Sequence, residues 1–341
     1  MKSVESTTNV QLQRKSHDAL SRLRNPGIWL TIVLVLAFGL YPIITDNPAT
    51  REVVFTMLLS VGLASSLNII MGYTGYVSFG HVVFFGLGGY VGLYLMGVLG
   101  TNLWVALAGG GIAAGLLAFL LGKAILRLRG GYFALATIGV NEAMRAFINN
   151  FTPFGGPTGI SLNFQIYNDY GGAMAALWMT YYILIVVVLT AVLLSYFVKT
   201  SKFGLGLMAI REDEDAAEIM GVVPPSAKTW AYVLSAILPG VLGVLFFFKN
   251  GNIEPPQAFR LHMSIELLVM VMLGGYGTVL GPVIGAAGYQ RLRGFLLTSP
   301  LFKNIQLSVA GVLLLIIILF IPAGAVGWLR HRFPKLRRFL P

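Results

Sequence analysis

The sequence predicts an all-α, polytopic membrane protein. Hydrophobic residues make up 56% of its 341 residues and charged residues only 11%, whereas soluble domains carry about 25% charged residues. The shortage of charge extends along the whole chain, where apolar runs alternate with short polar segments. Glycine is abundant, with 41 residues, as is typical where membrane helices pack closely or are broken. This composition excludes a soluble domain with one anchor.

The apolar runs give the candidate membrane spans, because a helix needs about 20 apolar residues to cross the hydrocarbon layer. The run 27–45 follows a hydrophilic stretch much longer than the charged region of a cleaved signal peptide, so we expect a retained first span. The further candidates are 53–71, 80–99, 102–125, 131–150, 176–198, 229–249 and 302–322. The apolar region 262–297 holds either one long broken span or two.

Four basic segments indicate how often the region 262–297 crosses. They are 1–26 (Lys2, Arg14, Lys15, Arg22, Arg24), 123–129 (Lys123, Arg127, Arg129), 199–228 (Lys199, Lys202, Arg211, Lys228) and 330–338 (Arg330, Arg332, Lys335, Arg337, Arg338). Cytoplasmic segments are rich in Lys and Arg, and all four share one side only if 262–297 crosses twice. We therefore expect a short helix, 262–274, and a second, 278–297, joined at Gly274–Gly277. The total is ten spans, with both termini cytoplasmic.

This topology divides the chain into a basic cytoplasmic leader (1–26), a transmembrane domain (27–322) and a basic cytoplasmic tail (323–341). The longest outer loop, 151–175, contains no Lys or Arg, as expected. Ten spans divide into five and five, which is the arithmetic of an inverted repeat. The net charge of +11 follows the positive-inside pattern, so we expect the lipid bilayer and not nucleic acid as the partner of the basic segments. The chain has no cysteine, which excludes disulfides and cysteine metal sites.

A polar, glycine-rich segment, 68–81, interrupts an apolar run. Irregular backbone at membrane depth occurs where it is shielded by protein or lines a water-filled cavity. We interpret the segment as a broken helix beside a translocation path. The alternative is an interfacial turn with Tyr73 and Tyr76 as belt aromatics. The candidate path residues are Asn68, Tyr73, Thr74, Ser78 and His81.

The predicted span 131–150 also carries polar groups: Thr137, Asn141, Glu142 and Arg145. Ionisable groups within a span are costly and usually face the interior of the bundle. Glu142 and Arg145 are three residues apart, so they share a helix face and can pair. They are either a structural pair near the outer membrane surface, or they take part in gating or in docking an outside partner. Thr137, Asn141 and Glu142 join the candidate path residues.

Small residues recur every four positions at Gly277, Gly281 and Gly285. This spacing predicts a groove along one helix face for close contact with another helix. The nearby Glu266 is expected near the outer end of its helix, where it need not be buried.

The loop 199–228 is the longest predicted cytoplasmic loop and is amphipathic. Its apolar residues include Leu207 and Ile210, with acids at 212–215, and we expect one or two short helices near the membrane surface. Amphipathic helices that bind lipid favour Lys and Arg on the polar face. This loop is acidic instead, which favours contact with a protein.

At these residues the chain resembles the membrane permease subunits of branched-chain amino acid ABC transporters, of the LivM type. The resemblance covers about 50–320 and is carried by the segments Asn68–Tyr90, Arg129–Arg145, Gly155–Ile160, Ser201–Gly221 and Leu273–Ala286. Asp215-Ala216-Ala217 followed by Gly221 resembles the Glu-Ala-Ala…Gly coupling motif of bacterial import permeases, with Asp in place of Glu. The resemblance implies ATPase-coupling residues, namely Arg211, Glu212, Asp215, Ala216, Ala217, Glu218 and Gly221.

The resemblance implies an ABC importer permease fold of about ten helices in the bacterial inner membrane. It also implies a heterodimer with a homologous LivH-type permease, two cytoplasmic ATPases that bind ATP and Mg²⁺, and an extracytoplasmic binding protein. The expected cargo is branched-chain or other neutral amino acids. The chain itself has no G-x-x-x-x-G-K-[ST] motif, since Gly122-Lys123-Ala124 does not fit it. We therefore expect a transporter subunit that is not an enzyme and holds no cofactor or metal.

Two alternatives stay open. Related permeases carry urea or short-chain amides, and the sequence does not distinguish these cargoes. An ion-coupled secondary transporter needs a titratable site within the membrane, for which Glu142 is the main candidate. A membrane enzyme is disfavoured, because the sequence contains no H-E-x-x-H, no G-x-S-x-G and no clustered carboxylate pair.

Overall fold

The computed structural model describes residues 26–45, 47–298, 308–309, 311–312, 315 and 324–333. The predicted leader apart from Pro26, most of the predicted span 302–322 and part of the predicted tail lie outside these residues. The long helices are α2 (Pro26–Thr45), α3 (Pro48–Thr74), α4 (His81–Gly97), α5 (Leu103–Ile125), α6 (Gly131–Asn150), α7 (Ala173–Thr200), α10 (Pro224–Asn250), α12 (Leu261–Gly274) and α13 (Leu280–Thr298). The shorter helices are α8 (Lys202–Glu212), α9 (Glu214–Ile219), α11 (Pro255–Ala258) and α15 (Gly324–Arg332).

Every predicted span from 27–45 to 278–297 coincides with a helix in the structure. Within the described residues, six helical stretches are long and apolar enough to cross a membrane. The chain is therefore an all-α polytopic membrane protein. The region 262–297 forms two helices, α12 and α13, as expected, and they join through residues 275–279.

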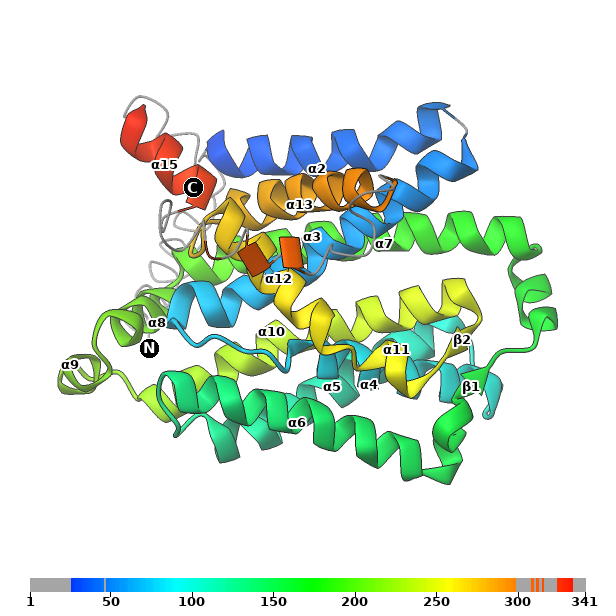
Figure 1. The fold of residues 1–341 in the computed structure, drawn as a ribbon, viewed down its shortest axis with the longest axis horizontal. Helices are drawn as coiled ribbons and strands as arrows, with labels where there is room; N and C mark the ends of the chain where they lie inside the picture. The colour runs from blue at the N-terminus through cyan, green and yellow to red at the C-terminus, as the bar shows by residue number, and fades with distance from the viewer. Residues whose placement is uncertain are drawn as a thin grey trace, which may run out of the picture.

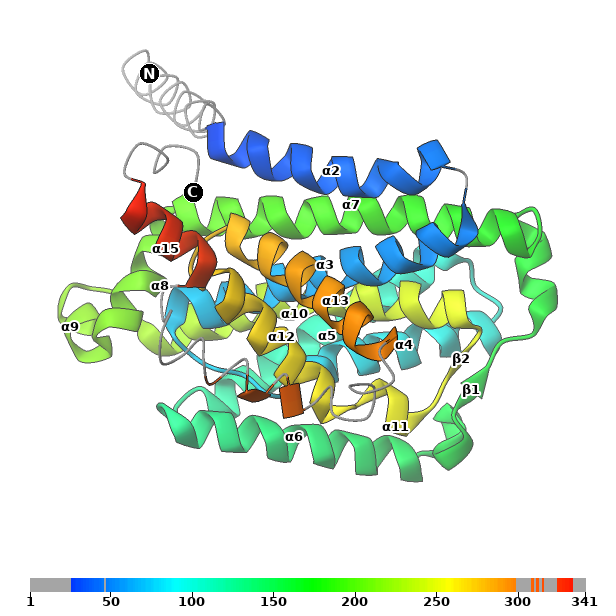
Figure 2. The same ribbon diagram turned by 45° about the horizontal axis from the view of Figure 1, so that its top comes forward.

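The long helices run side by side, and the connections gather at the two ends of the bundle (Figure 1). Helices α8, α9 and α15 lie at one end. The other end carries three short 3-10 helices (Thr152–Phe154, Gly156–Thr158 and Phe164–Tyr170) and a two-stranded antiparallel sheet of β1 (Ile160–Ser161) and β2 (Asn252–Ile253). Both views place α2 along one long side of the bundle and α6 along the opposite side (Figure 2). By the positive-inside pattern, we expect the end with α8 and α9 to be cytoplasmic.

The helices α3 and α10 form the centre of the bundle. In their most apolar windows, 89% of the residues of α3 and 78% of those of α10 are buried, against 33% for α2. Glycines bring the neighbouring helices against α10. A Cβ atom at Gly243 would lie 2.0 Å from the carbonyl oxygen of Phe85, and one at Gly88 would lie 2.3 Å from that of Gly240. Close approach of small residues is the usual way in which membrane helices pack.

Two crossings of the bundle are half extended and half helical. Helix α3 ends at Gly75, which takes φ of 77°, and residues 75–80 run back into the bundle before α4 begins (Figure 1). Helix α10 ends at Gly251, with φ of 74°. Residues 251–260 then return from the other end, and α12 begins midway along the bundle. Helices α4 and α12 therefore point toward opposite ends.

The segment 68–81 thus contains the broken helix that its glycines predict. A second break lies at 251–260, between α10 and α12. The glycine-rich stretch Gly274–Gly281, which resembles it in sequence, is instead the tight connection between α12 and α13. That connection packs closely, since a Cβ atom at Gly285 would lie 1.9 Å from the carbonyl oxygen of Met270. The groove predicted from the glycine spacing is therefore filled by α12.

The close contact at Gly243 gives a test of this packing. We expect Gly243→Ala to lower the stability of the protein by about 1–3 kcal/mol, because the added methyl group overlaps the backbone of α4. The melting temperature of the purified protein in detergent measures the effect. Gly139→Ala on α6 is the matched control, since no atom lies within 4 Å of its added Cβ. Equal melting temperatures for the two variants would contradict the packing.

Candidate functional site

The loop 199–228 carries the predicted coupling motif and is called the coupling loop below. It forms two short helices, α8 and α9, at the end of the bundle that is predicted to be cytoplasmic. Ser201 begins α8, and its side chain accepts a hydrogen bond from the backbone N–H of Gly204. Asp213 begins α9, and its carboxylate accepts from the N–H groups of Asp215 and Ala216. Both are typical helix N-caps, since a short polar side chain satisfies free backbone N–H groups. The sequence therefore places the helix boundary within the acidic run.

A buried lysine connects this loop to the rest of the protein. The ammonium of Lys228, on α10, is buried and donates hydrogen bonds to Glu214 Oε1 at 2.7 Å, to the Tyr76 hydroxyl at 2.8 Å and to the carbonyl of Leu126 at 2.8 Å. The Tyr76 hydroxyl donates to Glu214 Oε2 at 2.9 Å. A buried ion pair is tolerated only when such hydrogen bonds satisfy both partners. The network joins α9, α10, the α5–α6 turn and the extended segment 75–80.

Arg129 holds the acidic residue of the coupling motif. Its guanidinium donates two hydrogen bonds to Asp215, at 2.7 and 3.3 Å, and lies 3.6 Å from Glu214. The hydrogen bond and the positive charge of Arg129 keep the pKa of Asp215 below its ordinary value. The hydrogen bond to Asp215 and the charge of Glu214 raise the pKa of Arg129. Asp215 is therefore ionised at neutral pH.

Arg211 fastens α8 to the two glycine-rich segments. It donates a hydrogen bond to the carbonyl of Gly72 at 3.0 Å and lies over the ring of Tyr276 at 5.7 Å. Its side chain covers Gly75, where a Cβ atom would lie 3.0 Å from Arg211 Cγ. Arg211 also pairs with Glu212 at 2.8 Å, on the solvent side.

The two glycine-rich segments also contact each other directly. The buried amide of Asn68 accepts from the N–H of Gly277 and donates to the carbonyl of Thr278, both at 2.9 Å. The carbonyl of Gly277 accepts from Lys199 Nζ at 2.7 Å. The end of α3 and the α12–α13 connection, distant in sequence, are thus one hydrogen-bonded unit. Tyr73 extends it to α7, since its hydroxyl lies 2.7 Å from Ser195 Oγ.

In the middle of the bundle, α6 holds both extended segments. Thr137 accepts a hydrogen bond from the N–H of Phe79 at 3.1 Å, and Asn141 donates to the carbonyl of Phe259 at 3.0 Å. Thr137 and Asn141 are one turn apart on the buried face of α6. They satisfy backbone groups that a continuous helix would have satisfied itself.

Of the other predicted path residues, three are buried and one is exposed. Thr74 is buried and donates to the carbonyl of Ile70 at 2.5 Å. Ser78 and His81 are buried beside the start of α4. Glu142 pairs with Arg145 at 3.0 Å, and both side chains are about half exposed on the outer face of α6. The structure thus brings most of the predicted residues together at the helix breaks and leaves Glu142 outside this group.

The coupling motif divides into a buried and an exposed part. Ala217 is buried within the loop, whereas Ala216, Glu218 and Gly221 are exposed. Two neighbouring apolar side chains are exposed far more than their type usually is: Ile219 at 87% and Met220 at 84%. Exposed apolar groups of this kind mark interaction surfaces. The buried Ala217 therefore packs beneath the surface formed by Ile219 and Met220.

Sequence reasoning missed several residues of these networks. Lys228 and Arg129 served only as topology markers. Glu214 had no assigned role, and Tyr76 was considered only as a belt aromatic. These residues are far apart in the sequence, and their contacts become evident only once α9 is placed beside α10. Glu266 was expected to need no burial. Its side chain is only 15% exposed and pairs with Arg293 at 3.3 Å, because α13 covers it.

No metal site forms within the described residues, where no three His, Asp or Glu side chains gather. That the chain holds no cofactor stays a prediction.

Residues 50–322 match the protein family described as the branched-chain amino acid transport system permease component. The high-affinity branched-chain amino acid transport system permease protein LivM of Escherichia coli K12 is 31% identical over 287 residues, which are 76% of this chain and 66% of the relative. LivH of Salmonella typhimurium is 25% identical over 293 residues, 78% of this chain and 90% of the relative. This chain thus spans slightly less than two thirds of the LivM relative. No protein of solved structure gives a significant match.

The buried pair of Lys228 and Glu214 gives a prediction for the coupling loop. Lys228→Met or Glu214→Gln alone should lower stability by about 3–5 kcal/mol, because each leaves its partner charge or hydrogen bonds unsatisfied. The double variant should recover part of this loss. Melting in detergent and hydrogen exchange of residues 212–222 measure both effects. The exposed Glu218→Gln is the control, and single variants that match it would contradict the network.

Proposed function

This chain belongs to the branched-chain amino acid transport permease family, and from that membership we propose that it is the membrane permease subunit of an ATP-driven ABC importer. It is a multi-pass protein of the inner membrane. The proposed cargo is branched-chain and other neutral hydrophobic amino acids, which the names of its relatives support. The subunit itself is not an enzyme, and ATP and Mg²⁺ are bound by its partners.

The observation that carries the proposal is the attachment of the coupling loop to the helix breaks. The loop presents Ile219 and Met220 to the cytoplasm, and we assign this surface to a groove of an ATPase subunit. Behind it, Glu214 is bonded to Tyr76 and Arg211 to Gly72. A displacement of α8 and α9 by closure of the ATPases would therefore move residues 72–80, where α3 and α4 are broken. Such motion of packed elements is a common switching mode.

The proposed topology has ten spans in a five-plus-five inverted repeat, with both termini cytoplasmic. The two half-extended crossings, 75–97 and 251–274, support the repeat because they run in opposite directions after the two central helices (Figure 1). Inverted repeats of transporters typically place such broken helices at corresponding positions. The start of α2 and the helix α15 lie at the cytoplasmic end, which supports the position proposed for the termini.

The proposed assembly contains a second, homologous permease, two cytoplasmic ATPases and an extracytoplasmic binding protein. Similarity to both LivM and LivH proteins supports the permease pair. The outer face of α6 supports it as well, because a half-exposed Glu142–Arg145 pair is costly against lipid and a neighbouring subunit would cover it. The binding protein would dock at the opposite end from α8 and α9, on the surface formed by 151–172.

Ion coupling is the less favoured alternative. Its main candidate, Glu142, is paired with Arg145 and lies apart from the helix breaks. Import of urea or short-chain amides by the same fold stays an alternative cargo.

The proposed ATPase contact can be tested by introducing negative charges into the exposed apolar surface of the coupling loop. Ile219→Asp with Met220→Asp should reduce the ATPase subunits that co-purify with this chain at least tenfold, because burying two apolar side chains is worth about 3 kcal/mol or more. The matched control is Val98→Asp with Leu99→Asp, two exposed apolar residues at the other end of the bundle. Undiminished co-purification with the first pair would refute the docking surface.

Transport itself can be measured with the purified complex in proteoliposomes. We expect leucine accumulation that requires ATP and the binding protein, is inhibited by isoleucine and valine, and continues in the presence of a protonophore. Uptake that needs no ATP and stops with the protonophore would favour the ion-coupled alternative. Competition by urea or acetamide in place of isoleucine would change the assigned cargo.

A further inference from the structure

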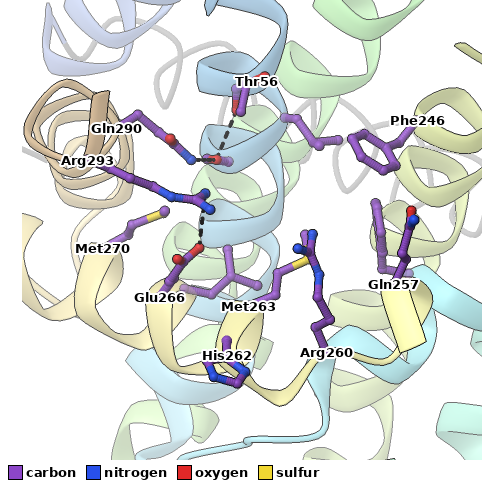
Figure 3. A pocket seen from close by; sticks show the side chains of 14 residues that line it. Thr56, Phe246, Gln257, Arg260, His262, Met263, Glu266, Met270, Gln290 and Arg293 are labelled. Atoms are coloured by element: carbon purple, nitrogen blue, oxygen red, sulfur yellow. Dashed lines mark hydrogen bonds and ion pairs between the residues drawn. The ribbon is translucent and has the colours of Figure 1, made fainter. Parts of the chain in front are cut away.

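A polar cavity lies in the outer half of the bundle, beside the second helix break, 251–260, and away from the first, 75–80. Its volume is about 510 Å³, within the range of small-molecule sites. It is lined by the outer parts of α3, α10 and α13 and by the first turns of α12, and Figure 3 shows Arg260, His262 and Glu266 beside it. None of the path residues that the sequence predicted lines this cavity.

The charges of the cavity are unbalanced. Glu266 is paired with Arg293 at 3.3 Å. Arg260 also lines the cavity, and no carboxylate of the described part of the chain lies within ion-pair distance of it. Arg260 is exposed although it directly precedes α12, which begins midway along the bundle. An unpaired guanidinium at membrane depth is costly and marks a functional site by default.

The start of α12 adds to the positive field. Arg260 is the residue that precedes the helix, and no side chain caps the first turn. The N-terminal end of a helix carries partial positive charge and free N–H groups. Broken helices in transporters direct such ends at the anionic group of a substrate. Arg260 and the helix end therefore favour one anion at the same place.

The rest of the cavity provides a second polar group and an apolar wall. Gln290 donates to Ser60 Oγ at 2.6 Å, which fixes its amide next to Arg293, on the side away from Glu266 (Figure 3). Phe85, Phe246, Leu267 and Met263 supply apolar surface. The unpaired guanidinium of Arg260, the carboxylate of Glu266 and an apolar wall correspond to the carboxylate, the ammonium and the side chain of a neutral amino acid.

We propose that this cavity is a binding site for the transported amino acid within the permease itself. Arg260 binds the α-carboxylate as a charge-assisted pair, Glu266 and Gln290 accept from the ammonium, and the apolar wall contacts the aliphatic side chain. The proposal rests on the proposed function, because it names the substrate of that importer. It adds a site of recognition in this chain to the one expected in the binding protein.

The test uses the absence of cysteine from the natural chain. Met263→Cys places the chain's single thiol in the cavity. The complete complex carrying M263C is reconstituted in phosphatidylcholine vesicles without binding protein, and the rate of maleimide labelling is followed on the gel band of this chain. We expect saturating leucine to slow labelling at least fivefold. Leucinamide, which lacks the carboxylate, and 4-methylpentanoate, which lacks the ammonium, should protect at least tenfold more weakly.

Arg260→Gln combined with M263C should raise the leucine concentration needed for half-protection at least tenfold and remove the preference for leucine over leucinamide. Arg260→Lys, which keeps the charge, should retain part of that preference. The matched control is Arg291→Gln, an exposed arginine on α13 that does not line the cavity. Co-purification of the ATPases shows whether each variant assembles. If R260Q does not assemble, the preference of R260K for leucine over leucinamide decides the proposal.

Labelling that leucine does not slow, in vesicles that accumulate leucine once ATP and the binding protein are supplied, would overturn the cavity and leave the importer intact. Vesicles that accumulate no branched-chain amino acid would overturn the importer. Protection of the thiol by leucine measures binding in the cavity and does not depend on uptake. A labelling rate that falls when phosphatidylglycerol is added, and not with leucine, would identify a lipid headgroup as the occupant and overturn the proposal.

Discussion

The constraint on which this structure depends is the need to satisfy backbone polar groups within the bilayer. A continuous helix satisfies its own N–H and C=O groups, but 75–80 forms no helix and 251–260 forms only the single turn α11. Side chains from other elements supply the missing partners. Thr137 and Asn141 on α6 bond Phe79 and Phe259, and Asn68 on α3 bonds the α12–α13 connection. The breaks are possible only because these side chains are placed beside them.

The same requirement links the cytoplasmic surface to the interior. The guanidinium of Arg211 satisfies the carbonyl at the end of α3, and the ammonium of Lys228 joins Glu214 to Tyr76. Through these hydrogen bonds, the coupling loop helps to stabilise the broken helix. A force on α8 and α9 therefore reaches residues 72–80 through buried, directional contacts. Small residues at Gly88 and Gly243 hold α4 against α10 at the same time, so α4 can move only with its neighbours.

The two halves of the bundle differ in their polar groups. At the cytoplasmic end, the buried charges are paired and hydrogen bonded, as in Lys228 with Glu214. In the outer half, the cavity beside α12 keeps Arg260 without a carboxylate partner among the described residues. Satisfied groups stabilise a conformation, whereas an unsatisfied cation at membrane depth favours binding an anion. In the mechanism proposed above, this difference separates the transmission of motion from the recognition of a substrate.

The sequence by itself determined the all-α membrane class, the positions of the described helices and the place of the coupling loop, because hydropathy, basic segments and helix caps are local properties. It also located the first helix break from its glycines. It did not identify the counterpart at 251–260, the role of Lys228, the burial of Glu266 or the cavity at Arg260. These depend on which residues, distant in the chain, face each other after packing. Only the tertiary structure decides that, since the charge of Arg260 or Lys228 has the same local sequence signal whether its partner is water, a carboxylate or a ligand.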